Sequence, residues 1–443
     1  MGPDEEGLGS FGLHDLFAML GSPGPVNWEV ARQVAAGLAT ADPETGEPRP
    51  EPPIDPAGAA ELVDLVRIAQ THVTAVTGLA EVGAVPARAV TRVEWTVLTL
   101  DALRPVLEAL STTLIGDAPQ GFDPATFLGG TAESAAEAIG ANPEMLAGMM
   151  AALAPTLFGV QAGSLVGLLA QHALGQYDLP LPLAGAPQLA FIVANIDAFA
   201  ADWSIDPRDL RLALGLREVA RCAPRSVPWV RDRLVRLASE YVSGYEMRPE
   251  AIEAQLGELL PPGFDLANFD PASFDPANFD PANFDPTNFD PTNFDPANFD
   301  PTALGDLGAF GDLDPTRLLD ALRSPRQLPT QAALQRFGAV LEGYVDVVVE
   351  HVAALLAPGA GRIDEALRRH RAENGRHTDF VDKMLGLHLD RTHYDGGQAF
   401  ARGVVERAGL DGLNRLWERE SMLPTENEFA APGLWLARIE LES

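Results

Sequence analysis

The stretch Leu189-Ala-Phe-Ile-Val193, followed by Pro207-Arg-Asp-Leu-Arg-Leu-Ala-Leu-Gly-Leu-Arg-Glu-Val-Ala-Arg221, decides the fold. A short apolar run after the proline-rich segment Asp178–Pro187 is typical of a buried strand. Asp206 and Pro207 supply a helix cap and a proline at the first helical position, so a helix is predicted to run to about Ala223. The sequence therefore predicts one strand followed by one long helix.

Most of the remaining chain has helical periodicity. Six prolines between Asp42 and Pro56 predict a loop. The predicted helices are Val26–Leu38, Ala59–Thr77, Thr91–Thr113, Val230–Val242, Gln331–Leu356, Ile363–Glu373, Phe380–Leu389, Gly397–Ala408 and Leu413–Glu418. The expected fold class is mainly α with a small β element.

One segment, Met145–Tyr177, has no charged residue, but Pro155 and several polar side chains interrupt its apolar character. We expect a buried helix or helix pair there and no membrane span. Gly159, Gly163 and Gly167 recur every four residues on one helical face, where missing side chains would let a second helix approach closely.

A low-complexity block with a five-residue period covers Phe264–Thr302, in which Phe-Asp is usually followed by Pro. Five residues fit neither the helix nor the strand repeat, and proline removes a backbone donor from nearly every unit. The block resembles the pentapeptide-repeat family, which would imply a short β-helix, but eight units complete only about two coils. We therefore expect an irregular insertion outside the core.

These features divide the chain into four parts. They are a flexible N-terminal tail (1–25), a helical region (26–248), the acidic Phe-Asp-Pro insertion (249–320), and a C-terminal helical region that completes the same domain (321–443).

Composition narrows the class of protein. In 443 residues, 63 Asp and Glu against 31 Lys and Arg give a formal net charge of −32, which disfavours nucleic acid as a partner. The single cysteine, Cys222, excludes an internal disulfide and a thiolate metal cage. The first ten residues lack the pattern of a secretory signal. We expect a protein of the cytoplasm.

Isolated candidates for chemistry are weak. No His-Glu-x-x-His, Gly-x-Ser-x-Gly or phosphate-binding glycine loop occurs in the sequence. His388 and His393, with Asp390 and Asp395 beside them, allow a metal site, but solvated histidines at helix ends are the simpler interpretation. Cys222 follows an arginine that could activate a thiol, yet a small buried residue is the commoner role.

Several segments taken together are more specific: Asn195-Ile-Asp-Ala-Phe-Ala-Ala-Asp-Trp203, Pro207–Arg221 and Val227-Pro-Trp-Val-Arg-Asp-Arg233. They resemble a family of bacterial zincin-like candidate hydrolases that is common in actinobacteria. Its members are often labelled zinc-dependent metalloproteases or deazaflavin-coenzyme-biosynthesis-associated proteins. The resemblance extends to four further segments: Val26–Gln33, Gly175–Pro182, Leu341–Asp346 and Trp417–Pro424.

The resemblance implies a zincin-like fold and a zinc site built on His-Glu-x-x-His, with a glutamate on a later helix as third ligand. Here the corresponding residues are Arg217, Glu218 and Arg221, and the later glutamate is Glu342. Glu218 would be a vestigial general base. Arginine has no lone pair for a metal, so the expected cofactor is none. We expect Arg217 and Arg221 to pair with Glu342 where zinc would sit.

The sequence therefore favours a zincin-like metalloprotease homologue that has lost zinc binding and has a structural, binding or regulatory role with an unknown protein partner. One alternative is an active zinc-dependent hydrolase. Another, compatible with the first, is an interaction protein whose partner binds the Phe-Asp-Pro block.

Overall fold

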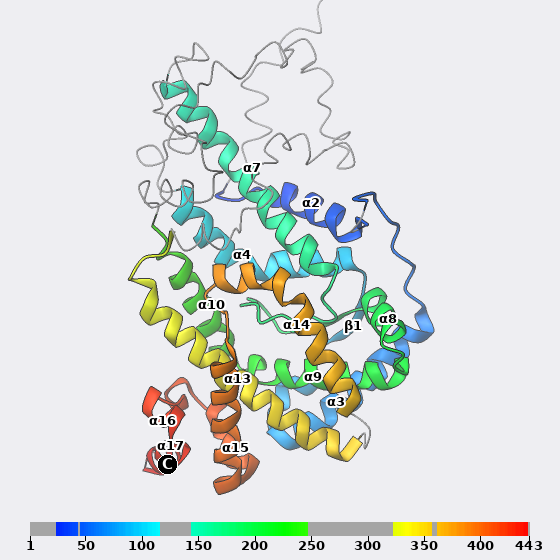
Figure 1. The fold of residues 1–443 in the computed structure, drawn as a ribbon, viewed down its shortest axis with the longest axis vertical. Coiled ribbons are helices and arrows are strands. Elements are labelled where there is room, and N and C mark those ends of the chain that lie inside the picture. Colours follow the sequence, from blue (N-terminus) through cyan, green and yellow to red (C-terminus); the bar gives the residue numbers. More distant parts are fainter. Residues whose placement is uncertain (1–23, 43–44, 116–142, 247–321, 357–360, 442–443) are drawn as a thin grey trace, which may run out of the picture.

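The computed structural model describes residues 24–42, 45–115, 143–246, 322–356 and 361–441 (Figure 1). The Phe-Asp-Pro block and most of the N-terminal tail lie outside the described residues. In chain order the elements are α2 (Trp28–Thr40), α3 (Pro56–Thr77), the 3-10 helix η1 (Ala80–Ala84), β1 (Ala87–Val90), α4 (Arg92–Ile115), α7 (Pro143–Ala170), β2 (Leu189–Ile192), α8 (Val193–Asp202), α9 (Pro207–Ser226), α10 (Pro228–Val242), α13 (Gln327–Leu356), α14 (Gly361–Met384), α15 (Arg391–Asn414), η5 (Arg415–Trp417), η6 (Glu420–Met422), α16 (Glu426–Ala430) and α17 (Pro432–Leu441).

The predicted strand is present as β2, and all four of its residues are buried. It pairs in parallel with β1, with Ala87 opposite Leu189 and Val90 opposite Ile192. The sequence analysis missed β1, because a four-residue strand is too short for its alternation to stand out. The described chain confirms a mainly α fold with a small β element.

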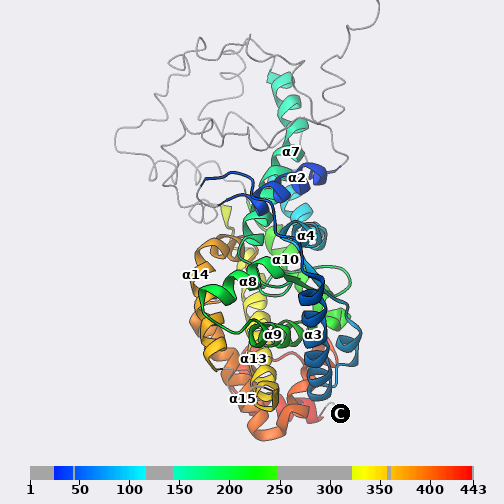
Figure 2. The same ribbon diagram turned by 90° about the vertical axis from the view of Figure 1, so that its right-hand side faces the viewer.

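The glycine face of α7 packs against α2 (Figures 1 and 2). A Cβ added at Gly159 or Gly163 would overlap the carbonyl oxygen of Asn27 or Ala31. One added at Gly167 would lie 2.8 Å from the Ala35 carbonyl oxygen. Both sets of positions advance by four residues in the same direction, so the two helices run parallel. The predicted packing role of the glycines is confirmed.

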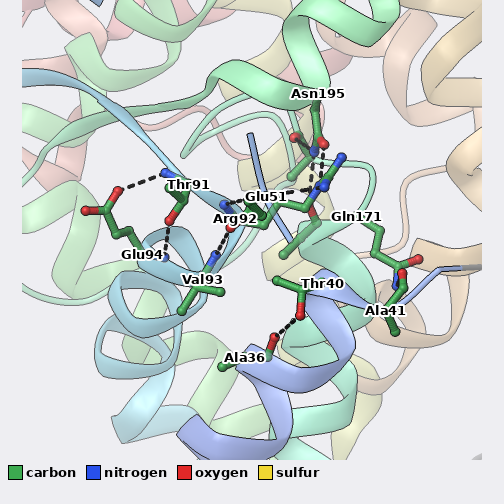
Figure 3. Close-up of polar contacts among 12 residues, drawn as sticks. Ala36, Thr40, Ala41, Glu51, Thr91, Arg92, Val93, Glu94, Gln171 and Asn195 are labelled. Atoms are coloured by element: carbon green, nitrogen blue, oxygen red, sulfur yellow. Dashed lines mark hydrogen bonds and ion pairs between the residues drawn. The ribbon is translucent and has the colours of Figure 1, made fainter. Parts of the chain in front are cut away.

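A polar cluster joins α4, α7 and α8 (Figure 3). The Asn195 amide donates to the carbonyl oxygens of Ala170 and Ala173, which satisfies acceptors at the end of α7. Its oxygen accepts from Arg92 Nε at 2.7 Å. The carboxylate of Glu51, in the predicted loop, accepts from the backbone amides of Arg92 and Val93 at the start of α4. The cluster therefore fixes the start of α4 against the end of α7.

The second half of the fold is a layer of long helices around α9. Figures 1 and 2 show α9 crossing the described fold, with α3 beside it and α13 across it. The pair α13 and α15 crosses at Gly343 and Gly397, where an added Cβ would overlap backbone of the facing helix. Helices from residues 26–248 thus pack directly on helices from residues 321–443.

Several predicted boundaries are wrong. The two helices predicted at Ile363–Glu373 and Phe380–Leu389 are one helix, α14, because an internal glycine such as Gly375 costs a helix only about 1 kcal/mol. That helix ends before Gly386, whose φ of 71° forms the turn. The uncharged segment is helical only to Ala170 and continues as turns.

Elements at the C-terminus were also missed or merged. Helices α16 and α17 were not predicted, and neither was α8, which stands between the predicted strand and α9. Helix α15 begins at Arg391, earlier than the predicted Gly397. Gly409, with a φ of 68°, breaks α15 near the predicted gap between its two segments.

No helix within the described ranges is long and apolar enough to cross a membrane.

Replacing Gly163 by leucine should destabilise the protein by roughly 1–3 kcal/mol, because the side chain would meet the α2 backbone. Chemical denaturation of the full chain measures the change in unfolding free energy. Gln161→Leu, at an exposed position of the same helix, is the control and should shift it by less than about 0.5 kcal/mol. Equal losses in both variants would contradict the proposed tight crossing.

Candidate functional site

The candidate site lies on the second half of α9. The helix starts as predicted, with the Asp206 carboxylate accepting from the amides of Arg208 and Asp209 and with Pro207 at the first position. From Leu214 to Ser226 every residue is buried, charged ones included. A helix buried all round normally carries apolar side chains. Charged residues there must find partners inside the protein.

Arg221 is the centre of the site, and only 3% of it is exposed. Its guanidinium lies 3.6 Å from each of three carboxylates. Glu218 is on the same helix, Glu342 is on α13, and Asp178 is in the segment after α7. Burial alone would lower the pKa of Arg221, but these carboxylates outweigh it and the pKa is raised. Arg221 is therefore a fixed buried cation.

Glu218 is 2% exposed, and its carboxylate faces the backbone of the segment after α7, which also carries Asp178. Its Oε2 accepts the Tyr177 amide at 2.6 Å. Gly175 makes room for this carboxylate, because an added Cβ would lie 2.5 Å from Oε2. Burial raises the pKa of Glu218 to about 7, although Arg221 opposes the shift.

Two further arginines of α9 are buried. Arg217 is 7% exposed, so its side chain does not point to solvent. Arg225 donates to the Arg221 carbonyl oxygen at 2.7 Å, and its guanidinium lies 5.6 Å from the centre of the Tyr177 ring. Burial lowers the pKa of Arg225. The face of α9 at positions 217, 221 and 225 therefore presents three cations in succession.

The remaining candidates have structural surroundings. Cys222 is buried, and burial raises its pKa to about 12, which leaves a neutral thiol rather than a nucleophile. His388 contacts Asp379 and His393 contacts Asp390, each pair on a partly exposed surface. Among the residues that the structure describes, no group of three or more His, Cys, Asp and Glu side chains is arranged to hold a metal ion.

The predicted contact between Arg221 and Glu342 is confirmed. The contact of Arg217 with Glu342 stays a prediction. Asp178 and Arg225 were missed. Asp178 had a signal, because it is the first charged residue after the uncharged segment, and Arg225 continues the four-residue spacing of Arg217 and Arg221.

Comparisons with known proteins agree with this architecture. A model of a family described as zincin-like metallopeptidase matches residues 26–436. The fold is similar to a crystal structure from Chloroflexus aurantiacus, described as a candidate hydrolase with a novel fold. The TM-score is 0.53 and the identity 20%, and the match covers 94% of this chain and 99% of that one. No curated protein matches the sequence.

Glu342→Ala should cost more than about 2 kcal/mol of unfolding free energy, because it removes one partner from a buried cation. The matched control is Glu350→Ala on the same helix, whose partner Arg402 is exposed, and it should cost under about 1 kcal/mol. Urea denaturation measures both. If the two variants lost the same stability, the buried network would contribute no more than a surface pair.

Glu218 should make stability depend on pH. Its folded pKa of about 7 lies above the ordinary value of 4.5, so the folded state binds the proton more tightly than the unfolded state. The stabilisation of the folded state by this tighter proton binding is complete below pH 4.5 and is lost as pH rises through 7. Glu218→Gln removes this titration. The unfolding free energy of the variant minus that of the wild type should therefore rise between pH 5 and pH 8, by on the order of a few kcal/mol. Denaturation at a series of pH values tests this, and parallel curves would contradict it.

Proposed function

This chain belongs to the zincin-like metallopeptidase family, and from that premise we propose that it is a pseudoenzyme. Its family fold would be kept for a binding, structural or regulatory role. The observation that carries the proposal is the guanidinium of Arg221 among three carboxylates. A buried cation in that position supplies the charge that those carboxylates need.

The residues present do not fit zinc. Protein zinc ligands are thiolates, neutral imidazoles and carboxylates, all of which donate a lone pair. Arg217 and Arg221, in the family's histidine positions, offer none and repel a divalent cation. Glu342 and Asp178 already face Arg221. Two carboxylates engaged with an internal cation are a poor site for a metal.

The position of Glu218 also argues against hydrolysis. A general base must come within hydrogen-bond reach of the water or substrate that it deprotonates. Glu218 is instead buried against the Tyr177 amide and the Arg221 guanidinium. Its pKa near 7 would suit proton transfer, but the surrounding helix leaves it almost without exposed surface.

If the protein has a binding role, its partner would not contact this network, because the network is buried. The partner would instead meet an outer face of the helices, or the acidic Phe-Asp-Pro block between Phe264 and Thr302. Repeated Phe-Asp-Pro units offer an aromatic side chain and a negative charge together, which suits a partner with basic and apolar surface.

Restoring the histidines tests the proposal. The double variant Arg217→His with Arg221→His places two imidazoles one helical turn apart, with Glu342 and Asp178 near the second. Saturating Zn²⁺, at about 100 times its Kd, should then stabilise the variant by roughly 2.7 kcal/mol. The wild type should show no change in melting temperature with either Zn²⁺ or a chelator.

The control is Arg217→Gln with Arg221→Gln, which removes the same charges and adds no ligand. It should not respond to Zn²⁺. Stoichiometric zinc in the purified wild type, with peptidase activity that a chelator abolishes, would overturn the proposal in favour of an active metallohydrolase.

A further inference from the structure

Arg221 and Arg225 of α9 are both buried, but their surroundings differ. Arg221 has three carboxylates at 3.6 Å. Arg225 is 6% exposed and forms no ion pair with any carboxylate that the structure describes. Its charge is balanced by the Tyr177 ring and by the more distant carboxylate of Glu342, yet burial still lowers its pKa. Within the described chain, Arg225 is therefore a buried cation that is incompletely neutralised.

Both guanidinium groups also carry a hydrogen-bond donor that is not used. The Nε–H groups of Arg221 and Arg225 are buried, and neither meets an acceptor within the described chain. Nearly all buried donors in proteins are paired, and one that is not marks strain or a bound water or ion. Here two such donors, both on cations, occur one turn apart on the same helix.

The two donors belong to neighbouring side chains. Residues four apart lie on the same face of a helix, with Cβ atoms about 5–6 Å apart. Arg225 also folds back along α9, because its Nη1 donates to the Arg221 carbonyl oxygen at 2.7 Å. The terminal nitrogens of Arg221 face the three carboxylates, and its Nε is a separate donor. One acceptor placed between the two side chains would therefore satisfy both Nε–H groups without displacing a carboxylate.

We propose that Arg221 and Arg225 bind a single chloride ion inside the protein. A negative acceptor supplies the charge that Arg225 lacks as well as the two hydrogen bonds, which a water molecule would not. The ion must be small and monovalent. The neighbouring Tyr177 and Cys222 are buried, so an ion enclosed beside them loses its water, at a cost that rises steeply with its charge. The carboxylates around Arg221 would also repel a multivalent anion more strongly.

This ion would be part of the folded structure. The site involves neither a partner protein nor a hydrolytic step, so it goes beyond the function proposed above and does not depend on it. A ligand that binds only the folded state stabilises that state, by an amount that grows with the free ligand concentration. Chloride should therefore stabilise the protein beyond the general effect of salt.

Urea denaturation of the full chain tests the proposal. Sodium gluconate, whose anion is too large for an enclosed site, is replaced stepwise by sodium chloride, so that ionic strength and charge screening stay constant. The urea midpoint of the wild type should rise steadily with chloride concentration. Arg225→Gln should lose this rise. Arg208→Gln removes an exposed arginine from the same helix and should keep it.

Anomalous scattering from bromide locates the ion and needs no variant, so it decides the question even if Arg225→Gln fails to fold. Crystals of the wild type grown in sodium bromide should show an anomalous peak within hydrogen-bond reach of both Nε atoms. A urea midpoint that does not respond to chloride would overturn the proposal, because a water molecule or the chain itself would then satisfy the two arginines. An equal rise in the wild type and Arg225→Gln would overturn it too, as would bromide peaks at the protein surface alone.

Discussion

The fold depends on one buried cation. The Arg221 guanidinium draws carboxylates from three separate segments to one point, namely its own helix α9, the α13 helix and the turn after α7. Removing a guanidinium and three carboxylates from water is costly, and only mutual compensation makes the arrangement tolerable. The segments that carry them must therefore meet within narrow limits, which constrains how the two halves of the chain assemble.

Close helix crossings supply that precision. The end of α7 is set by its glycine contact with α2 and by the Asn195 and Arg92 cluster, so the turn that carries Gly175, Tyr177 and Asp178 emerges at a defined place. On the opposite side, Gly343 next to Glu342 brings α13 against Gly397 of α15. Small residues at these crossings let the helix backbones pack closely, which fixes the positions of the helices. The ion network and the crossings thus depend on each other.

The overall architecture and the chemistry of the site depend on different residues. A structure that shares 20% of the sequence keeps the same architecture over nearly the whole chain. Chemistry depends on a few side chains, because a guanidinium such as that of Arg221 has no lone pair to offer a metal, whereas a neutral imidazole has one. Family membership therefore sets the expected location of a site, and the residues in it determine whether the site can work.

The sequence by itself determined most of the long helices, the buried strand β2 and the packing role of the α7 glycines, because each follows from local periodicity. The pairing of Arg221 with Glu342 followed from the resemblance to the zincin-like family. Only the tertiary structure decided that Asp178 joins the network, that Arg225 is buried and that Glu218 accepts the Tyr177 amide. Charge partners distant in sequence leave no periodic trace. The strand β1 and the continuity of α14 were also tertiary outcomes, because packing outweighs weak local preference in short strands and at single helix glycines.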